Sequence, residues 1–140
     1  KKVPLLGICL GMQVLHEWSD ENNGVPALGL IPGKVVRFPD PLPGAAERLK
    51  VPHMGWNRVK QTAKHPIWAG VPDDSWFYFV HSYYAMPRHK KHLLGSSEYG
   101  TPFAAAVAKD NIVAFQFHPE KSQGAGMTLL SNFVGWDGKP

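Results

Sequence analysis

The chain has one cysteine among its 140 residues, and it has no long apolar run. A single cysteine excludes an internal disulfide and suits a reducing compartment. A transmembrane helix needs about 20 consecutive apolar residues, which no stretch approaches. The apolar residues after Lys1 and Lys2 are too few for a secretory signal peptide. We therefore expect a cytoplasmic protein that does not act at a membrane.

Charge is also limited. The formal net charge is +4, and the densest basic cluster, at residues 88–92, lacks the interleaved aromatic residues and glycines that are typical of single-stranded nucleic-acid binding. We interpret this cluster as a solvated loop and expect no nucleic-acid partner. The hydrophobic content of 44% is high enough for residues 1–140 to fold as a single domain.

The spacing of apolar residues predicts an α/β fold. A buried strand is predicted over residues 3–8 and a helix over residues 12–18, and the prolines and glycine at residues 39–46 predict a loop. Most of the remaining chain is predicted as strands, followed by one closing helix. The strands cover residues 33–38, 56–60, 76–80, 92–97, 103–108 and 112–117, and the helix covers residues 126–134.

Cys9 lies within Gly-Ile-Cys-Leu-Gly, where the first predicted strand turns into the first predicted helix. A nucleophile flanked by glycines at such a junction is typical of the nucleophile elbow, here with cysteine in place of serine. Glycines permit a strained turn, and the start of a helix favours the thiolate over the thiol. The alternative is a small buried hydrophobic residue, which is the usual role of a free cysteine.

A second informative segment is His118-Pro119-Glu120, at the end of the strand predicted over residues 112–117. Residues i and i+2 of an extended chain point to the same side, and a proline keeps the residue before it extended. Histidine is the usual general base near neutral pH, and a carboxylate beside it can orient its ring. The alternative is a histidine that ends a strand beside a surface charge. With Cys9 at the same sheet edge, the three residues form a candidate catalytic triad.

These motifs resemble the class I, or triad, glutamine amidotransferases. The likeness rests on Gly-Ile-Cys-Leu-Gly-Met-Gln and Phe-His-Pro-Glu. The segments at residues 52–57, 79–83 and 115–122 further resemble the glutaminase subunits of imidazole glycerol phosphate synthase. The resemblance covers nearly the whole chain. It implies a class I glutamine amidotransferase-like (flavodoxin-like) α/β fold, with a mostly parallel sheet, flanking helices and an antiparallel β portion.

The same resemblance implies that βα units precede the nucleophile strand. A nucleophile strand normally lies in the middle of its sheet, so we expect residues 1–140 to be the C-terminal portion of the domain, without its N-terminal strands. The family's second oxyanion donor comes from a glycine-rich loop upstream of the elbow. Loss of one such donor typically costs about 10²–10³ in rate, so we expect these residues alone to be a poor glutaminase.

The resemblance implies that the chain hydrolyses L-glutamine to glutamate and ammonia. Cys9 would attack the side-chain amide carbon to form a γ-glutamyl thioester. His118 would move the protons, and Glu120 would orient His118. One oxyanion donor would be the backbone N–H of Leu10, which follows the nucleophile.

The substrate contacts that the resemblance implies involve four further residues. Gln13 would contact the bound glutamine, and Glu21 would meet its α-ammonium group. Ser82 and Tyr83 would offer backbone N–H groups to its α-carboxylate. The alternatives are a helix-surface role for Gln13, a solvated charge for Glu21 and a core position for Tyr83.

The resemblance also implies a partner. Ammonia would pass through a channel to a (β/α)₈-barrel cyclase subunit in a heterodimer, for imidazole glycerol phosphate synthesis in histidine biosynthesis. The residues expected to face the cyclase are Met54, Trp56, Asn57, Tyr78 and Lys121, although Trp56 could instead be core. No metal or organic cofactor is implied.

Two other functions stay open. One is the glutaminase domain of another class I amidotransferase, for GMP or anthranilate synthesis, against which the segment at residues 52–57 argues. The other is a catalytically inert interaction domain, against which the intact Cys9, His118 and Glu120 argue.

Overall fold

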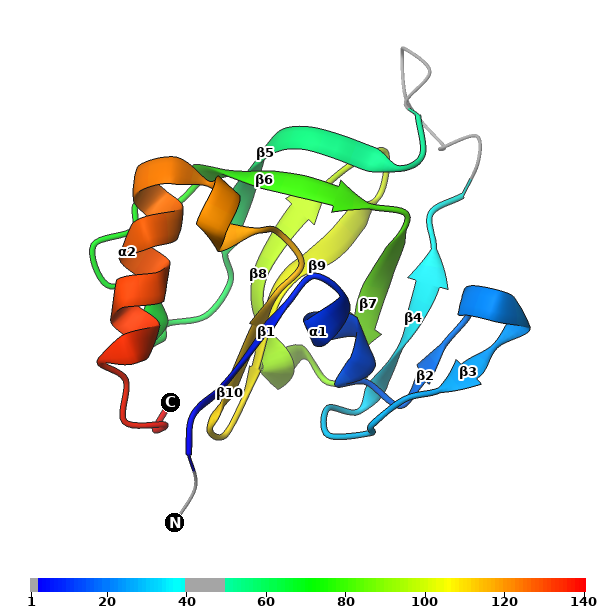
Figure 1. Cartoon of the computed structure of the whole chain (residues 1–140), viewed down its shortest axis with the longest axis horizontal. Helices are drawn as coiled ribbons and strands as arrows, with labels where there is room; N and C mark the ends of the chain where they lie inside the picture. The colour runs from blue at the N-terminus through cyan, green and yellow to red at the C-terminus, as the bar shows by residue number, and fades with distance from the viewer. Residues whose placement is uncertain (1–2, 40–49) are drawn as a thin grey trace.

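The computed structural model describes residues 3–39 and 50–140, so the loop predicted over residues 39–46 lies almost entirely outside the described residues. The described chain is rich in strands (Figure 1). The strands are β1 (Leu5–Ile8), β2 (Trp18–Ser19), β3 (Val25–Pro26), β4 (Gly33–Arg37), β5 (His53–Gln61), β6 (Ser75–His81), β7 (Tyr83–Pro87), β8 (Leu93–Glu98), β9 (Pro102–Lys109) and β10 (Ile112–Phe115). The helices are α1 (Leu10–Val14) and α2 (Gln123–Val134), with 3₁₀ turns η1 (Glu21–Asn23), η2 (Pro66–Trp68), η3 (Lys90–His92) and η4 (Pro119–Lys121).

The strands form two mixed sheets. The larger has the order β1-β10-β9-β8-β5-β6 and the smaller has the order β3-β2-β4-β7. Strands β1 and β10 pair in parallel, as do β2 and β4, while the other described pairs are antiparallel. The α/β class is confirmed, but parallel pairing is less common among the described strands than expected. The reason is that parallel neighbours need a long crossover, whereas β8, β9 and β10 follow one another through short turns.

All the strands predicted from the sequence are found, but three further strands were not predicted. Strands β2 and β3 have two residues each and exist only through their pairing with neighbours. Strand β7 follows β6 after Ser82 alone, where the chain passes from one sheet to the other. The helix predicted over residues 12–18 is shorter, because the chain leaves the helix after α1 so that β2 can pair with β4.

Strand β10 separates two hydrophobic cores. Val113 and Phe115 belong to a core that Leu129 of α2 also enters, whereas Ala114 belongs to a core shared with Met12 of α1. Alternate residues of a strand point to opposite faces, so the two helices cover opposite faces of the sheet. Figure 1 shows α2 and α1 on either side of the β1–β10 pair.

The parallel pairing of β1 and β10 brings two distant segments to one edge. Ile8 lies opposite Phe115 in the register, and the backbone N–H of Cys9 donates to the Phe115 carbonyl at 2.8 Å. Both strands run toward this edge, so the residues that follow them meet there. The expected juxtaposition of the cysteine and histidine motifs is thereby confirmed at the level of the backbone.

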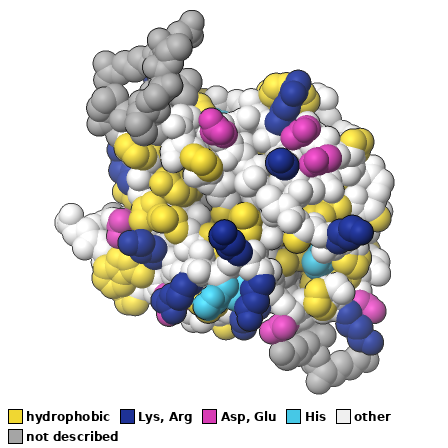
Figure 2. Space-filling model, turned by 180° about the vertical axis from the view of Figure 1, so that it is seen from behind, with side chains coloured by type: hydrophobic (Ala, Val, Ile, Leu, Met, Phe, Trp, Pro, Cys, Tyr) yellow, Lys and Arg dark blue, Asp and Glu magenta, His cyan; other side chains and the backbone are white. Residues whose placement is uncertain are grey.

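The face behind this view carries interspersed charges. Figure 2 shows Lys and Arg side chains mingled there with acidic and apolar ones. Within the basic cluster at residues 88–92, Arg88 forms an exposed ion pair with Glu17 at 2.6 Å.

Across the described residues, every helix is too short or too polar to cross a membrane.

Candidate active site

The backbone at Cys9 has the strained geometry of a nucleophile elbow. Its φ of 54° and ψ of −108° lie in a region that non-glycine residues rarely occupy. Gly7 makes the tight turn possible, since a Cβ there would lie 3.0 Å from the carbonyl carbon and oxygen of Gly11 and 3.1 Å from the Cβ of Ala114. A Cβ on Gly11 would meet open space. The structure thus confirms the predicted elbow and shows that Gly7 is the glycine it requires.

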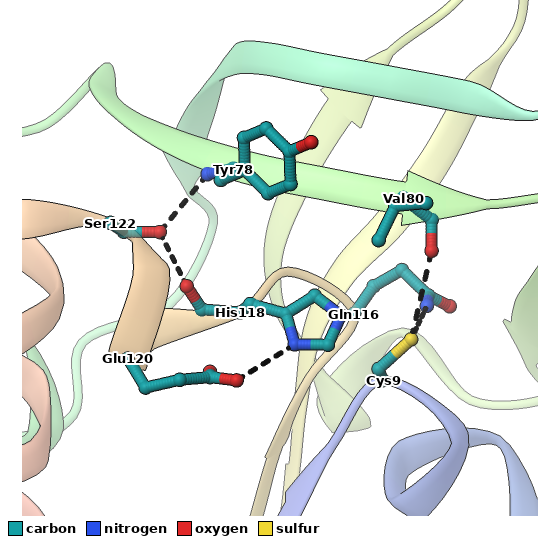
Figure 3. Close-up of polar contacts among 7 residues, drawn as sticks. All are labelled: Cys9, Tyr78, Val80, Gln116, His118, Glu120 and Ser122. Carbon is teal, nitrogen blue, oxygen red and sulfur yellow. Dashed lines mark hydrogen bonds and ion pairs between the residues drawn. The ribbon is translucent and has the colours of Figure 1, made fainter.

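Three polar groups face the sulfur of Cys9, and Figure 3 draws two of them, the Val80 carbonyl and the Gln116 amide. The Sγ–H group donates to the Val80 carbonyl at 3.8 Å, and the side-chain amide of Gln116 donates from Nε2 to Sγ at 3.7 Å. The backbone N–H of Leu10 also faces the sulfur. The contact with Val80 therefore turns the Cys9 thiol toward β6, the strand that faces the elbow.

The pKa of Cys9 is raised above its ordinary value, chiefly because the sulfur is partly buried. The charges of Glu120 and Glu21 raise it further, while the N–H groups of Leu10 and Gln116 lower it. The start of a helix was expected to favour the thiolate, but α1 has only five residues and burial raises the pKa of Cys9 more than the Leu10 N–H lowers it. Cys9 is a thiol at neutral pH and needs a base to become a nucleophile.

His118 and Glu120 form the expected pair. The Nδ1 atom of His118 lies 3.0 Å from Oε2 of Glu120, which leaves Nε2 free to take a proton. The geometry differs from the extended one that was expected, because Glu120 lies in the 3₁₀ turn η4. The turn still brings both side chains to one side, and the carboxylate fixes which ring nitrogen is basic.

The backbone of His118 is anchored to β6 and α2. Its N–H donates to the Tyr78 carbonyl at 2.9 Å. The buried Ser122 hydroxyl donates to the His118 carbonyl at 2.6 Å and accepts from the Tyr78 N–H at 3.0 Å (Figure 3). Gly126 lets α2 pack this closely, since a Cβ there would lie 1.9 Å from the Pro119 carbonyl oxygen.

Cys9 and His118 lie near each other without a direct hydrogen bond between their side chains (Figure 3). Among the described residues, the hydrogen-bond partners of the Cys9 side chain are Val80 and Gln116 rather than His118. Catalytic hydrogen bonds often form only when substrate is present. For His118 to take the thiol proton, Sγ would have to turn from the Val80 carbonyl toward Nε2 of His118.

A pocket of about 520 Å³ opens beside the elbow. Its walls come from α1, β2, η1, β3 and the residues after β3, and they are mostly apolar, with polar side chains at Gln13, Ser19, Glu21 and Asn22. They comprise Leu10, Gln13, Val14, Ser19, Glu21, Asn22, Val25, Pro26, Ala27 and Leu28. Gln13 is only 4% exposed, so it is not a helix-surface residue. Its Oε1 atom is buried and has no hydrogen-bond partner within residues 3–39 and 50–140.

Ser82 and Tyr83 lie where β6 passes into β7, outside the walls of this pocket. The Ser82 carbonyl accepts from the Phe38 N–H at 3.0 Å. The Tyr83 carbonyl accepts from the Gln13 amide at 3.0 Å, and the Tyr83 side chain is half-buried against the α1 core. The structure thus brings Gln13 and Tyr83 together, while Glu21 lines the same pocket as Gln13.

The residues expected to face a partner lie on β5, β6 and η4, and those on β5 divide between its two faces. Met54 and Trp56 are exposed on the outer face, where Trp56 lies opposite Tyr78 with ring centroids 5.9 Å apart. Trp56 is 45% exposed, so it is not core. Asn57 points to the other face and donates to the Glu98 carbonyl at 2.8 Å. Lys121 is exposed in η4.

Several residues of the site carried no signal in the sequence. Gln116, Ser122 and the Val80 carbonyl reach the site through tertiary contacts, although all three residues lie within segments that carried the resemblance. In the part of the chain that the structure describes, no group of three His, Cys, Asp or Glu side chains is placed to hold a metal ion.

Comparisons with known proteins agree with this geometry. A family model described as glutamine amidotransferase class-I matches residues 1–135. The chain is 61% identical over 136 residues to the imidazole glycerol phosphate synthase subunit HisH of Methylococcus capsulatus, covering 96% of this chain and 63% of that protein. It is 57% identical over 139 residues to the same-named subunit of Dechloromonas aromatica, covering 97% and 63%. The chain thus spans about 63% of the length of these relatives.

Solved structures show the same fold. A putative GMP synthase protein from Thermoplasma acidophilum matches with a TM-score of 0.65 at 21% identity, over 96% of this chain and 57% of that one. A glutamine amidotransferase from Thermotoga maritima matches with a TM-score of 0.59 at 18% identity, over 95% and 46%. The elbow, the His-Glu pair, the fold and the family match lead to one conclusion: this chain belongs to the class-I glutamine amidotransferase family.

Proposed function

We propose that this chain carries the glutaminase site of an imidazole glycerol phosphate synthase and hydrolyses L-glutamine to glutamate and ammonia. The observation that carries the proposal is the strained Cys9 elbow beside a histidine whose Nδ1 is held by Glu120 at 3.0 Å. The relatives that are 52–61% identical and named as HisH subunits support this choice among class-I amidotransferases.

The proposed reaction follows from the protonated Cys9 thiol and from the contact between His118 Nδ1 and Glu120. His118 takes the Cys9 proton on Nε2, because Nδ1 is bound to Glu120. The thiolate attacks the side-chain amide carbon of glutamine, and the Leu10 N–H donates to the developing oxyanion. His118 then returns the proton to the departing ammonia, which leaves a γ-glutamyl thioester. A water activated by His118 hydrolyses this thioester to glutamate.

The pocket beside the elbow is the proposed place of the substrate's amino-acid end. The Glu21 carboxylate would pair with the α-ammonium group, and Gln13, in the same pocket wall, would contact the bound glutamine. The backbone N–H groups of Ser82 and Tyr83 would bind the α-carboxylate, which requires glutamine to reach beyond the walls of the pocket.

The proposed partner is a (β/α)₈-barrel cyclase subunit that receives the ammonia in a cytoplasmic heterodimer. Met54, Trp56 and Tyr78 offer it an exposed apolar and aromatic face on β5 and β6, a composition typical of interfaces. Lys121, which is exposed in η4, would contribute at the rim, whereas Asn57 lies on the other face of β5 and would stay outside this contact face. The cyclase would use the ammonia for imidazole glycerol phosphate synthesis in histidine biosynthesis.

The test is covalent labelling of the full-length protein, assembled with the cyclase subunit, by a glutamine-analogue electrophile. We expect adduct formation on Cys9, located by mass spectrometry, and protection by glutamine. His118→Ala should slow labelling by about 10²-fold or more, as expected for loss of a general base. Labelling that is absent even with the cyclase, or that His118→Ala leaves unchanged, would contradict the proposal.

A further inference from the structure

A continuous series of buried polar groups leads from β5 to the sulfur of Cys9. His53 and His81 are joined from Nδ1 to Nε2 at 3.0 Å, and Nδ1 of His81 lies 2.8 Å from the Tyr83 carbonyl. Gln13 Nε2 contacts the same carbonyl at 3.0 Å and Oε1 of Gln116 at 2.9 Å. Both histidines and both glutamine side chains are at most 6% exposed.

The Tyr83 carbonyl sets the direction of every bond in this series. A carbonyl can only accept, so His81 must carry its proton on Nδ1, and its Nε2 is then an acceptor. His53 must therefore donate from Nδ1, which leaves its Nε2 to face the Asn57 amide at 3.4 Å. Burial lowers the pKa of His53 to about 3 and that of His81 to about 4, so both rings are neutral and these tautomers apply at neutral pH.

The same carbonyl orients the two glutamines. Gln13 must present its NH₂ group to Tyr83, and its second N–H then meets Oε1 of Gln116. With Oε1 of Gln116 used as an acceptor, its NH₂ group is directed at Cys9 Sγ, 3.7 Å away. A turned-over Gln116 amide would set an oxygen against the sulfur and an N–H against an N–H. The series therefore keeps the Gln116 N–H donor directed at Cys9 Sγ, the reacting atom.

We propose that Gln116 is a further catalytic residue, which stabilises the Cys9 thiolate by donating from Nε2, and that Gln13 and His81 are positioning residues that keep its amide in this direction. The inference rests on the proposed role of Cys9 as the nucleophile. The donor persists after His118 removes the proton, when the sulfur no longer needs the Val80 carbonyl as an acceptor. A hydrogen bond to a charged group is stronger than one to a neutral thiol, so the donor favours the reactive form.

The test is the rate at which iodoacetamide alkylates Cys9 in the full-length protein at pH 8, followed by mass spectrometry of the Cys9 peptide. Gln116→Met keeps the size of the side chain and removes the donor, which should lower the thiolate fraction about tenfold to a hundredfold. A more basic thiolate is also more nucleophilic, which offsets about half of this on a logarithmic scale. We therefore expect alkylation to slow about threefold to tenfold.

The matched control is Gln61→Met, which removes another glutamine hydrogen bond, 2.8 Å to the Val71 carbonyl, and should leave the rate unchanged. A merely structural role for Gln116 predicts the opposite sign, because loosened packing would expose the sulfur and speed its alkylation. An unchanged or faster rate in folded Gln116→Met overturns the proposal. Should that variant fail to fold, Gln116→Asn, whose shorter amide does not reach the sulfur, carries the same expectation.

The positioning role is tested separately. Gln13→Met should slow alkylation less than Gln116→Met, and the double variant should be no slower than Gln116→Met alone, because both act through one donor. Additive effects overturn the positioning role, as does an Nε2–H tautomer of His81 in ¹⁵N NMR. Iodoacetamide does not require a glutamine site, so failure of the proposed function would leave alkylation as informative as before.

Discussion

The two halves of the candidate site are built in opposite ways. The elbow at Cys9 is a local device, in which strained backbone and a neighbouring glycine present the thiol. The His118–Glu120 turn has ordinary backbone angles at His118 but is anchored from outside by Ser122, the edge of β6 and the packing of α2. The comparison teaches that a reactive group can be placed either by strain or by support, and the two should respond differently to mutation.

The largest expected effect is at the elbow. Cys9→Ala should abolish glutamine hydrolysis, roughly a 10⁴-fold loss or more, as for other deleted nucleophiles. Cys9→Gly removes the same sulfur but also relieves the positive φ, so it should be more stable than Cys9→Ala by about 1 kcal/mol. Urea unfolding of the two variants measures the strain, and equal stabilities would show that the elbow stores none.

At the His118–Glu120 turn, the largest loss of activity should follow removal of the Glu120 carboxylate. Glu120→Gln can donate to Nδ1 of His118, which favours the tautomer with a proton on Nε2 and removes the base. We expect kcat to fall by about 10²-fold with little change in stability, because Glu120 is about half exposed. A kcat within threefold of the wild type would show that Glu120 does not set the tautomer.

The buried His53 and His81 should make the stability of the fold depend on pH. The folded-state pKa values of His53 and His81, about 3 and about 4, lie below the ordinary value of 6.5. Between pH 6.5 and pH 4 the unfolded chain therefore binds more protons, and stability falls as pH falls, by on the order of a few kcal/mol. His81→Gln should flatten this dependence in urea unfolding, whereas His89→Gln, at an exposed position, should leave its slope intact.

The smallest expected effect tests the support of the turn. Gly126→Ala places a Cβ against the Pro119 carbonyl and should destabilise the protein by about 1–3 kcal/mol. Gly124→Ala, in the same helix but facing open space, should stabilise it by up to about 1 kcal/mol. Thermal unfolding distinguishes them, and equal shifts would mean that α2 does not brace the turn.

The sequence predicted the parts of the site that are encoded locally. Cys9 between glycines and the His-Pro-Glu segment are short patterns with a direct conformational meaning, and the structure shows the elbow and the His118–Glu120 contact. Gln116 and Ser122 could not be found in this way, because their partners lie 107 residues away in Cys9 and 44 residues away in Tyr78. The pKa of Cys9 lies outside the reach of local patterns for the same reason, since burial by distant elements decides its direction.

The fold shows the same difference between features that are encoded locally and features that depend on tertiary contacts. Strong alternating or apolar runs predicted the longer strands, whereas β2 and β3 are defined by their neighbours and by no pattern of their own. The direction of pairing was also outside the reach of local patterns, because it depends on which strands meet after folding. The outward side of Trp56 and the inward side of Asn57 became clear only from the register of β5 with β6.

The contact between the Cys9 thiol and the Val80 carbonyl has a chemical consequence. Peroxides and other oxidants attack the thiolate rather than the thiol. A sulfur that is partly buried, protonated and turned toward a carbonyl offers them little thiolate while no substrate is bound. The resting geometry therefore predicts slow oxidation of Cys9, because little of its sulfur is thiolate until a base takes the proton.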